Sequence, residues 1–242
     1  MCRLIPGALP RPLGIALAVA GCLARAQQPS EPGEEIDRIV ATVEGAEDGR
    51  VITLSDLQFE VAVSLVQRGA APDATARLDD RALRKGLEHS ISQRLLIAEA
   101  DKVGAFQPSE ADLDAVVRAF EQRFESPAAV ERFLRRYDAD RAGLRAVLRR
   151  SLRAERALDG RVRLRAQVSE VDVRRYYDLH QPELVGTFEE VGPSLRERLR
   201  RERYGALATE ELARLRKAAD VRLVAPPPPV PDEAEEGSER DP

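Results

Sequence analysis

The histidines and cysteines are the residues with which this sequence could carry out chemistry, and there are two of each. His89 is followed directly by Ser90, and a hydrolase needs such a base within hydrogen-bond reach of its nucleophile. Successive residues of a helix point about 100° apart, however, so these two side chains would not face each other. His180 stands alone at the end of a short helical pattern. We therefore predict no catalytic residue and interpret both histidines as surface or partly packed side chains.

Metal and cofactor motifs are not found in the sequence either. There is no H-x-x-x-H pair, no calcium-binding Asp/Asn loop and no Gly-rich phosphate-binding loop. The stretch AEDG at 46–49 is typical of a hairpin turn rather than of a metal loop. Cys2 and Cys22 both lie near the N-terminus, so a processed, exported chain would have no cysteine pair for a disulfide or a metal. We expect neither a metal nor a cofactor.

The N-terminal residues have the pattern of an export signal. Two arginines precede the apolar run LGIALAVAGCLA, which is too short to span a bilayer. The A-x-A sequence Ala24–Ala26 predicts a signal peptide over 1–26. The sequence Val19–Cys22 resembles a bacterial lipobox instead, which would remove 1–21 and leave Cys22 as a lipid attachment site. Both interpretations predict a periplasmic protein, and the second adds a lipid anchor in an envelope membrane.

The C-terminal residues 225–242, APPPPVPDEAEEGSERDP, have no apolar periodicity and contain six acids and one base. They predict a disordered, Pro-rich acidic tail. Cleavage after Ala26 would leave 35 basic residues against 42 acidic ones, and the tail holds most of this acidic excess. Because phosphate binding needs a net basic surface, we expect no nucleic acid as a partner.

An Arg-rich run at 132–165 could face anionic lipid or RNA, but its leucines and valines recur at helical spacing, which favours solvated helix faces.

The residues between these ends predict a mainly α domain. After a polar lead at 27–35, a β-hairpin is predicted over 36–53, with Ser55 as the cap of the helix that follows. Apolar residues then recur every three or four positions, which is the spacing of one helical face. Helices are predicted over about 56–67, 79–103, 108–124, 126–137, 140–158, 168–182 and 188–219, and a strand over 221–224.

The hairpin needs a partner strand. A two-stranded hairpin is marginal in water, and three strands are much more stable. The only other strand-like run is Val221–Val224, just before the tail. We therefore predict that residues 36–224 fold as a single multi-helix unit, whose N-terminal hairpin and C-terminal strand form one small sheet.

Several segments resemble the SurA-type periplasmic chaperones. The hairpin IDRIVATVEG…VITLSDL resembles the start of that family's N-terminal domain. ALRKGLEHSISQRLLIAEADKVG and PSEADLDAVVRAF resemble its long helix and the helix that restarts after it. VSEVDVRRYYDLHQPEL resembles the short helix that closes the domain, and the run from Thr187 to Val224 resembles the C-terminal helix and closing strand. The resemblance covers nearly the whole mature chain and rests on order and pattern rather than on one motif.

One departure from the family is as informative as the match. In that family, one or two parvulin-type prolyl isomerase domains usually stand between the short helix and the C-terminal helix. Here Leu184 is followed almost at once by Thr187. The two histidines also lie in helical patterns, without the β-rich frame of a parvulin site. The resemblance therefore implies the chaperone domain without the isomerase.

The function that the resemblance implies is ATP-independent binding of unfolded polypeptides, above all outer-membrane proteins in transit. Shallow apolar surface between helices would hold these clients. Two alternatives stay open: an auxiliary or residual peptidyl-prolyl isomerase, and a lipid-anchored envelope assembly protein with one fixed partner. Membrane contact is expected only through a lipid at Cys22.

Overall fold

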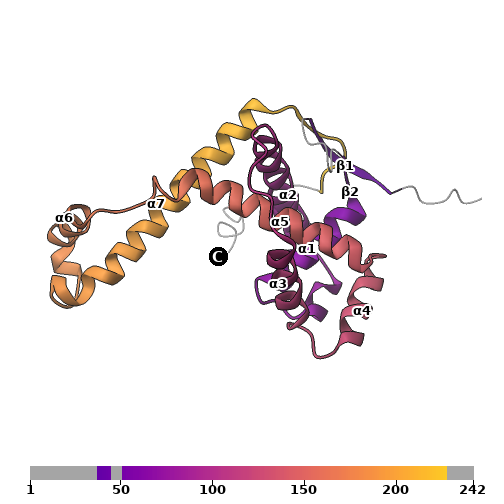
Figure 1. The fold of residues 1–242 in the computed structure, drawn as a ribbon, viewed down its shortest axis with the longest axis horizontal. Coiled ribbons are helices and arrows are strands. Elements are labelled where there is room, and N and C mark those ends of the chain that lie inside the picture. The colour runs from indigo at the N-terminus through magenta and orange to yellow at the C-terminus, as the bar shows by residue number, and fades with distance from the viewer. Residues whose placement is uncertain (1–36, 45–50, 228–242) are drawn as a thin grey trace, which may run out of the picture. The chain divides into compact units, whose positions relative to one another are not determined.

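Residues 37–44 and 51–227 are described by the computed structural model of this chain (Figure 1). They belong to one compact unit that begins at Asp37. Three strands and seven α-helices are found in the described residues, so the prediction of a mainly α fold with a small sheet is confirmed. Some sequence predictions concern residues outside this part, namely the signal peptide with Cys22, the polar lead at 27–35, the hairpin turn at 46–49 and the tail beyond 227.

A three-stranded antiparallel sheet joins the two ends of the described chain. Its strands, in spatial order, are β2 (Val51–Thr53), β1 (Ile39–Val43) and β3 (Val221–Leu223). Thr42 of β1 lies opposite Arg222 of β3, and the backbone N–H of Val224 donates to the Val40 carbonyl at 3.0 Å. The central strand is therefore paired on both edges, and the predicted meeting of the hairpin with the C-terminal strand is confirmed.

The first helix, α1 (Leu54–Gln67), begins two residues before its predicted start. Its N-cap is Thr53, whose hydroxyl accepts a hydrogen bond from the backbone N–H of Asp56 at 3.3 Å. The prediction of Ser55 as the cap was wrong. Ser55 instead donates its backbone N–H and its hydroxyl to the carboxylate of Asp37, a residue 18 positions earlier in the chain. A local pattern could not show this competing partner.

The other six α-helices of the described residues begin within two residues of their predicted starts. Serine or aspartate N-caps begin five of them, and these side chains accept backbone N–H groups of the first turn. The last begins after Thr187, whose backbone N–H donates to Glu190 at 2.8 Å. These helices are α2 (Asp80–Asp101), α3 (Glu110–Glu121), α4 (Pro127–Arg136), α5 (Arg141–Val162), α6 (Glu170–His180) and α7 (Phe188–Ala218).

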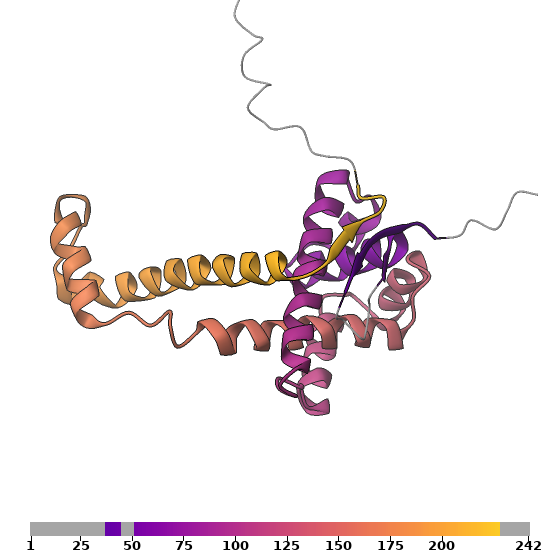
Figure 2. The same ribbon diagram turned by 90° about the horizontal axis from the view of Figure 1, so that it is seen from above.

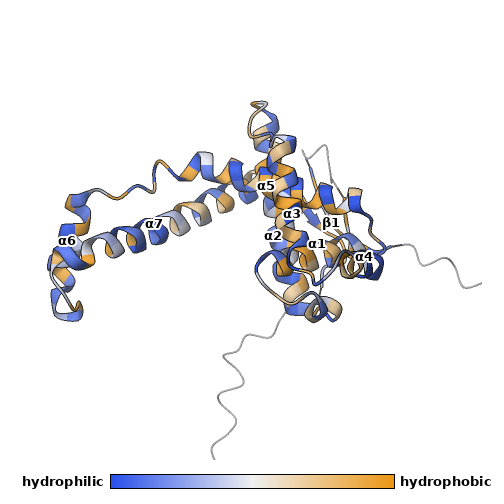
Figure 3. Ribbon diagram, turned by 60° about the horizontal axis from the view of Figure 1, so that its bottom comes forward, coloured by the Kyte–Doolittle hydropathy of each residue, from blue (hydrophilic) through white to orange (hydrophobic). Residues whose placement is uncertain are grey.

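Two apolar cores hold the sheet and helices α1 to α5 together (Figure 3). In the first, Ile52 of the sheet packs with Leu57 of α1 and Leu87 of α2, and all three side chains are fully buried. The second is rich in phenylalanine and joins α1, α3, α4 and α5. There the rings of Phe120 and Phe133 meet edge to face, with their centroids 5.8 Å apart.

Helix α6 packs mainly against α7, through a smaller cluster that includes Val173 and Tyr177. A short 3₁₀ helix (Gln181–Glu183) and residues 184–187 connect the two helices, and the Tyr177 hydroxyl donates to the Gly186 carbonyl at 2.9 Å. The described chain therefore passes from α6 to α7 without an inserted domain. Helix α7 also contacts α2 and α5 before it leads into β3 (Figure 2).

Candidate functional site

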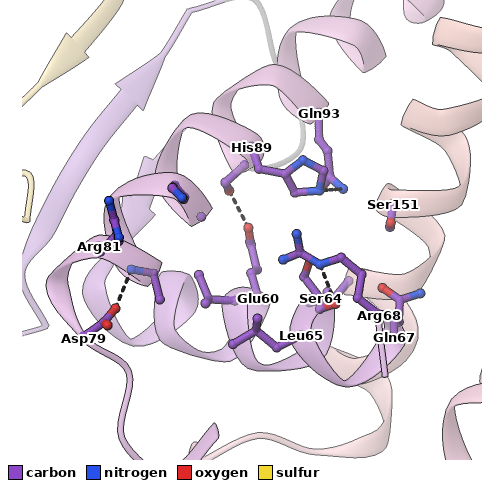
Figure 4. Close-up of a pocket in the computed structure, with 16 residues that line it drawn as sticks. Glu60, Ser64, Leu65, Gln67, Arg68, Asp79, Arg81, His89, Gln93 and Ser151 are labelled. Atoms are coloured by element: carbon purple, nitrogen blue, oxygen red, sulfur yellow. Dashed lines mark hydrogen bonds between the residues drawn. The ribbon is translucent and has the colours of Figure 1, made fainter. Parts of the chain in front are cut away.

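A cleft lies between α1 and α2 and is closed on one side by α5 (Figure 4). Its volume is about 360 Å³. The apolar part of its lining comes from Val61 and Leu65 of α1, Ala82 of α2 and Val147 of α5. We call this hollow the α1–α2 cleft.

The position of Gly86 explains how closely α1 and α2 approach beside the cleft. A Cβ atom at Gly86 would lie 2.0 Å from Cγ2 of Val61, which is far inside van der Waals contact. A larger residue at this point of α2 would therefore force Val61 or the two helices to move. The cost of glycine to the helix is offset by the close packing that it permits.

The rim of the cleft is positively charged. Arg68 lies on the α1 side, and Arg81 and Lys85 lie on the α2 side. Asp79 also lines the cleft, but its carboxylate is used as the N-cap of α2 and accepts the Ala82 N–H at 2.7 Å. The cleft thus combines an apolar floor with a basic rim, a combination that suits a ligand with an apolar part and a nearby carboxylate.

A buried ion network reaches the cleft through Glu60 and Ser90. The carboxylate of Glu60 on α1 accepts two hydrogen bonds from Arg94 of α2, at 2.9 and 3.2 Å, and a further one from Arg150 of α5. The Ser90 hydroxyl donates to the same carboxylate. Burial alone would raise the pKa of Glu60, but the two guanidinium groups outweigh burial and lower it. Glu60 is therefore a fixed anion rather than a proton donor.

The predicted chemistry-bearing residues do not come together. Ser90 bonds to Glu60, while the neighbouring His89 shares a 3.0 Å hydrogen bond with Gln93 (Figure 4). Partial burial and the nearby Arg68 lower the pKa of His89. His180 bonds through Nδ1 to the Tyr176 carbonyl at 2.9 Å and stacks on the Tyr176 ring.

Residues 37–44 and 51–227 contain no candidate metal site and no candidate membrane span. Histidine and acidic side chains there form no group of three or more that could hold a metal ion. None of the described helices combines the length and the apolar character that a membrane crossing requires. The possible lipid attachment site, Cys22, lies outside the described residues.

A second, shallower apolar surface lies between α6 and α7, and we call it the α6–α7 groove. Val168, Tyr176 and Leu179 line it from the α6 side, and Leu199 lines it from α7. Its volume is about 400 Å³. Leu179 is 72% exposed although it is a large apolar residue. Charged side chains of both helices, among them Arg175, surround this apolar centre.

Sequence reasoning missed both surfaces, although each has a signal in the sequence. Gly86 interrupts a long helical pattern, and such a glycine indicates a close helix contact. In α6, Val171 and Leu179 lie off the face that carries the buried Val173 and Tyr177, and they are 67% and 72% exposed. Apolar residues on two faces of a short helix indicate a surface that is left for another chain.

No protein-family model matches the chain, and no curated protein matches it.

Proposed function

We propose that this protein is an ATP-independent periplasmic chaperone that binds unfolded polypeptides, in particular outer-membrane proteins in transit. The observation that supports this most is the α6–α7 groove, where the exposed side chain of Leu179 lies with partly buried apolar residues and charged ones. An unfolded segment can place an apolar side chain in such a groove, while its backbone and polar groups stay in water.

The expected affinity is modest. Burial of apolar surface contributes roughly 25 cal/mol per Å², so one leucine-sized side chain contributes about 1.5–3 kcal/mol. Ordering of the client chain opposes this gain. Contacts of this kind are weak one by one and reversible, and they need neither ATP nor a covalent step.

The order of elements also supports the proposal. The hairpin, the long α2, the short α6 and the closing strand β3 follow one another in the order that the resemblance to SurA-type chaperones implies. The direct passage from α6 to α7 agrees with a chaperone domain without an inserted isomerase. Periplasmic location rests on the export signal expected over residues 1–26.

The proposal is tested by aggregation of an unfolded outer-membrane protein after dilution from urea, followed by light scattering. We expect the full mature chain to suppress aggregation at a few-fold molar excess. Leu179→Glu places a charge in the α6–α7 groove and removes an apolar anchor. It should raise the concentration needed for half-suppression by roughly tenfold, the equivalent of about 1.4 kcal/mol.

Leu164→Glu is the matched control. Leu164 is 73% exposed and does not line the α6–α7 groove, so the same substitution there should leave suppression unchanged. The proposal fails if the wild-type chain does not suppress aggregation at several-fold excess. It also fails if the two leucine variants behave alike.

A further inference from the structure

The described chain ends against α2, the helix that forms one side of the α1–α2 cleft. Pro227, the last described residue, is buried, and its carbonyl accepts a hydrogen bond from the Arg84 side chain of α2. The same helix provides Arg81 and Lys85 to the rim of the cleft. The C-terminal residues 228–242 therefore start from a point on the helix that forms one side of this cleft.

Helix geometry places the cleft within reach of these residues. Successive residues of a helix are about 100° apart around its axis. Arg81 therefore lies about 60° from Arg84 around the α2 axis, and Lys85 lies about 100° from it in the same direction. An extended chain covers about 3.3 Å per residue, so Val230 can lie about 10 Å from Pro227 and Asp232 about 16 Å. A helix with its side chains is about 10–12 Å across. The segment can pass over α2 and enter the cleft.

The composition of this segment matches the cleft. Residues 228–231 read PPVP and are apolar, and DEAEE at 232–236 follows with four acids. The cleft has an apolar floor and basic residues on both rims. Neither Arg68 nor Lys85 has an ion pair within the described residues. Many arginines elsewhere do pair with carboxylates, as Arg141 does with Glu121 at 2.5 Å.

We propose that the α1–α2 cleft binds the chain's own C-terminal segment. Val230 enters the apolar floor, and the acids of 232–236 pair with Lys85 and Arg68 on the two rims. The bound segment covers the cleft and competes there with any other peptide that has an apolar residue followed by acids. The proposal does not depend on the chaperone function or on the α6–α7 groove.

The direct test is site-specific photocrosslinking in the full chain, with benzoylphenylalanine in place of Val230. We expect crosslinks within one chain to peptides of α1 and α2 that line the cleft. Crosslinks to other segments alone would overturn the proposal. So would crosslinks that only join two copies, since these would make a second chain the occupant, or the absence of any crosslink.

Charge reversal tests the role of the rim. The double substitution Arg68→Glu and Lys85→Glu should lower the crosslink yield roughly tenfold at low salt, since each exposed pair contributes modestly and two are lost. Arg201→Glu, a reversal at an exposed residue of α7, is the matched control and should not change the yield. An equal yield in the double variant and the control contradicts the proposal.

A peptide-binding measurement tests the same claim without substitutions at the rim, so misfolding of the double variant cannot affect it. A chain that ends at Pro227 should bind a labelled peptide of residues 228–242 in fluorescence anisotropy, and this binding should weaken several-fold between 50 and 500 mM salt. The full chain should bind the same peptide at least tenfold more weakly, because its own segment occupies the cleft. Equal binding by both chains, or binding that salt does not affect, would contradict the proposal.

Discussion

Glu60 is the residue around which three helices of the bundle meet. Its carboxylate bonds to Ser90 and Arg94 on α2 and to Arg150 on α5, which are 30, 34 and 90 positions away in the sequence. The side chains of Glu60 and Arg94 are only 10% and 2% exposed. A sequence shows a glutamate in a helix here, but it cannot show that the partners are distant arginines. This network was therefore not predicted.

The structure predicts a large cost for Glu60→Gln. Glutamine keeps the shape and can still accept a hydrogen bond, but it removes the buried carboxylate charge that pairs with Arg94 and Arg150. Breaking a buried pair in this way costs about 3–5 kcal/mol. Urea denaturation, followed by circular dichroism, should show this loss in the free energy of unfolding.

Glu110→Gln is the control for this prediction. Glu110 also accepts hydrogen bonds from two arginines, Arg145 at 2.7 Å and Arg149 at 2.8 Å, but its side chain is 68% exposed. Exposed pairs contribute at most about 1 kcal/mol. If both variants lose a similar free energy of unfolding, burial does not determine how much the Glu60 network contributes to stability.

At the scale of elements, helix starts were predictable and helix contacts were not. Ser109 and Ser169 each begin a capping box, with Asp112 and Asp172 three residues later, and such patterns are complete within four residues of sequence. The start of α1 was predicted wrongly because Asp37, outside that window, binds Ser55. The α1–α2 cleft depends on which faces of two helices meet, and Gly86 indicates only that some helix comes close, not which one.

Gly86 gives a prediction at this scale. Gly86→Ala would bring a methyl group against Val61, so α1 and α2 must separate or Val61 must leave its rotamer. Overpacking of this kind costs about 1–3 kcal/mol, although alanine is the better helix former. Thermal unfolding of the variant should show a lower Tm.

Gly205→Ala is the matched comparison within α7. A Cβ atom at Gly205 would have no neighbour within 4 Å, so only the helix preference acts there. The variant should gain about 0.5–1 kcal/mol and have a higher Tm. If Gly86→Ala stabilises the protein as Gly205→Ala does, the close approach of α1 and α2 at Gly86 is not real.

At the scale of the whole molecule, the pairing of the two ends could be predicted because the choices were few. The hairpin needed a third strand, and the sequence offered one strand-like run outside it. In the structure this run is β3, and its Arg222 lies opposite Thr42 of β1. The location of exposed apolar surface was not predictable in the same way. Leu199 belongs to a regular helical pattern and Leu179 lies off the buried face of α6, but only the packing of α6 on α7 places both around an open groove.

The Arg-rich helices also have a simple explanation at this scale. The sequence favoured solvated helix faces for them, and Arg141, Arg145 and Arg149 all pair with carboxylates of α3. These pairs lie on exposed side chains and contribute little each. Because these basic residues of α5 are paired, the surfaces that distinguish this protein are the α1–α2 cleft and the α6–α7 groove.

The central claim is that the α6–α7 groove binds unfolded polypeptide, and a photocrosslinker at position 179 tests it most directly. With benzoylphenylalanine in place of Leu179, the full chain should crosslink to an outer-membrane protein diluted from urea and not to the same protein once folded in detergent. The crosslinker in place of Leu164 should give little product with either form. Equal yields from the two positions, or equal yields with folded and unfolded client, would contradict the claim.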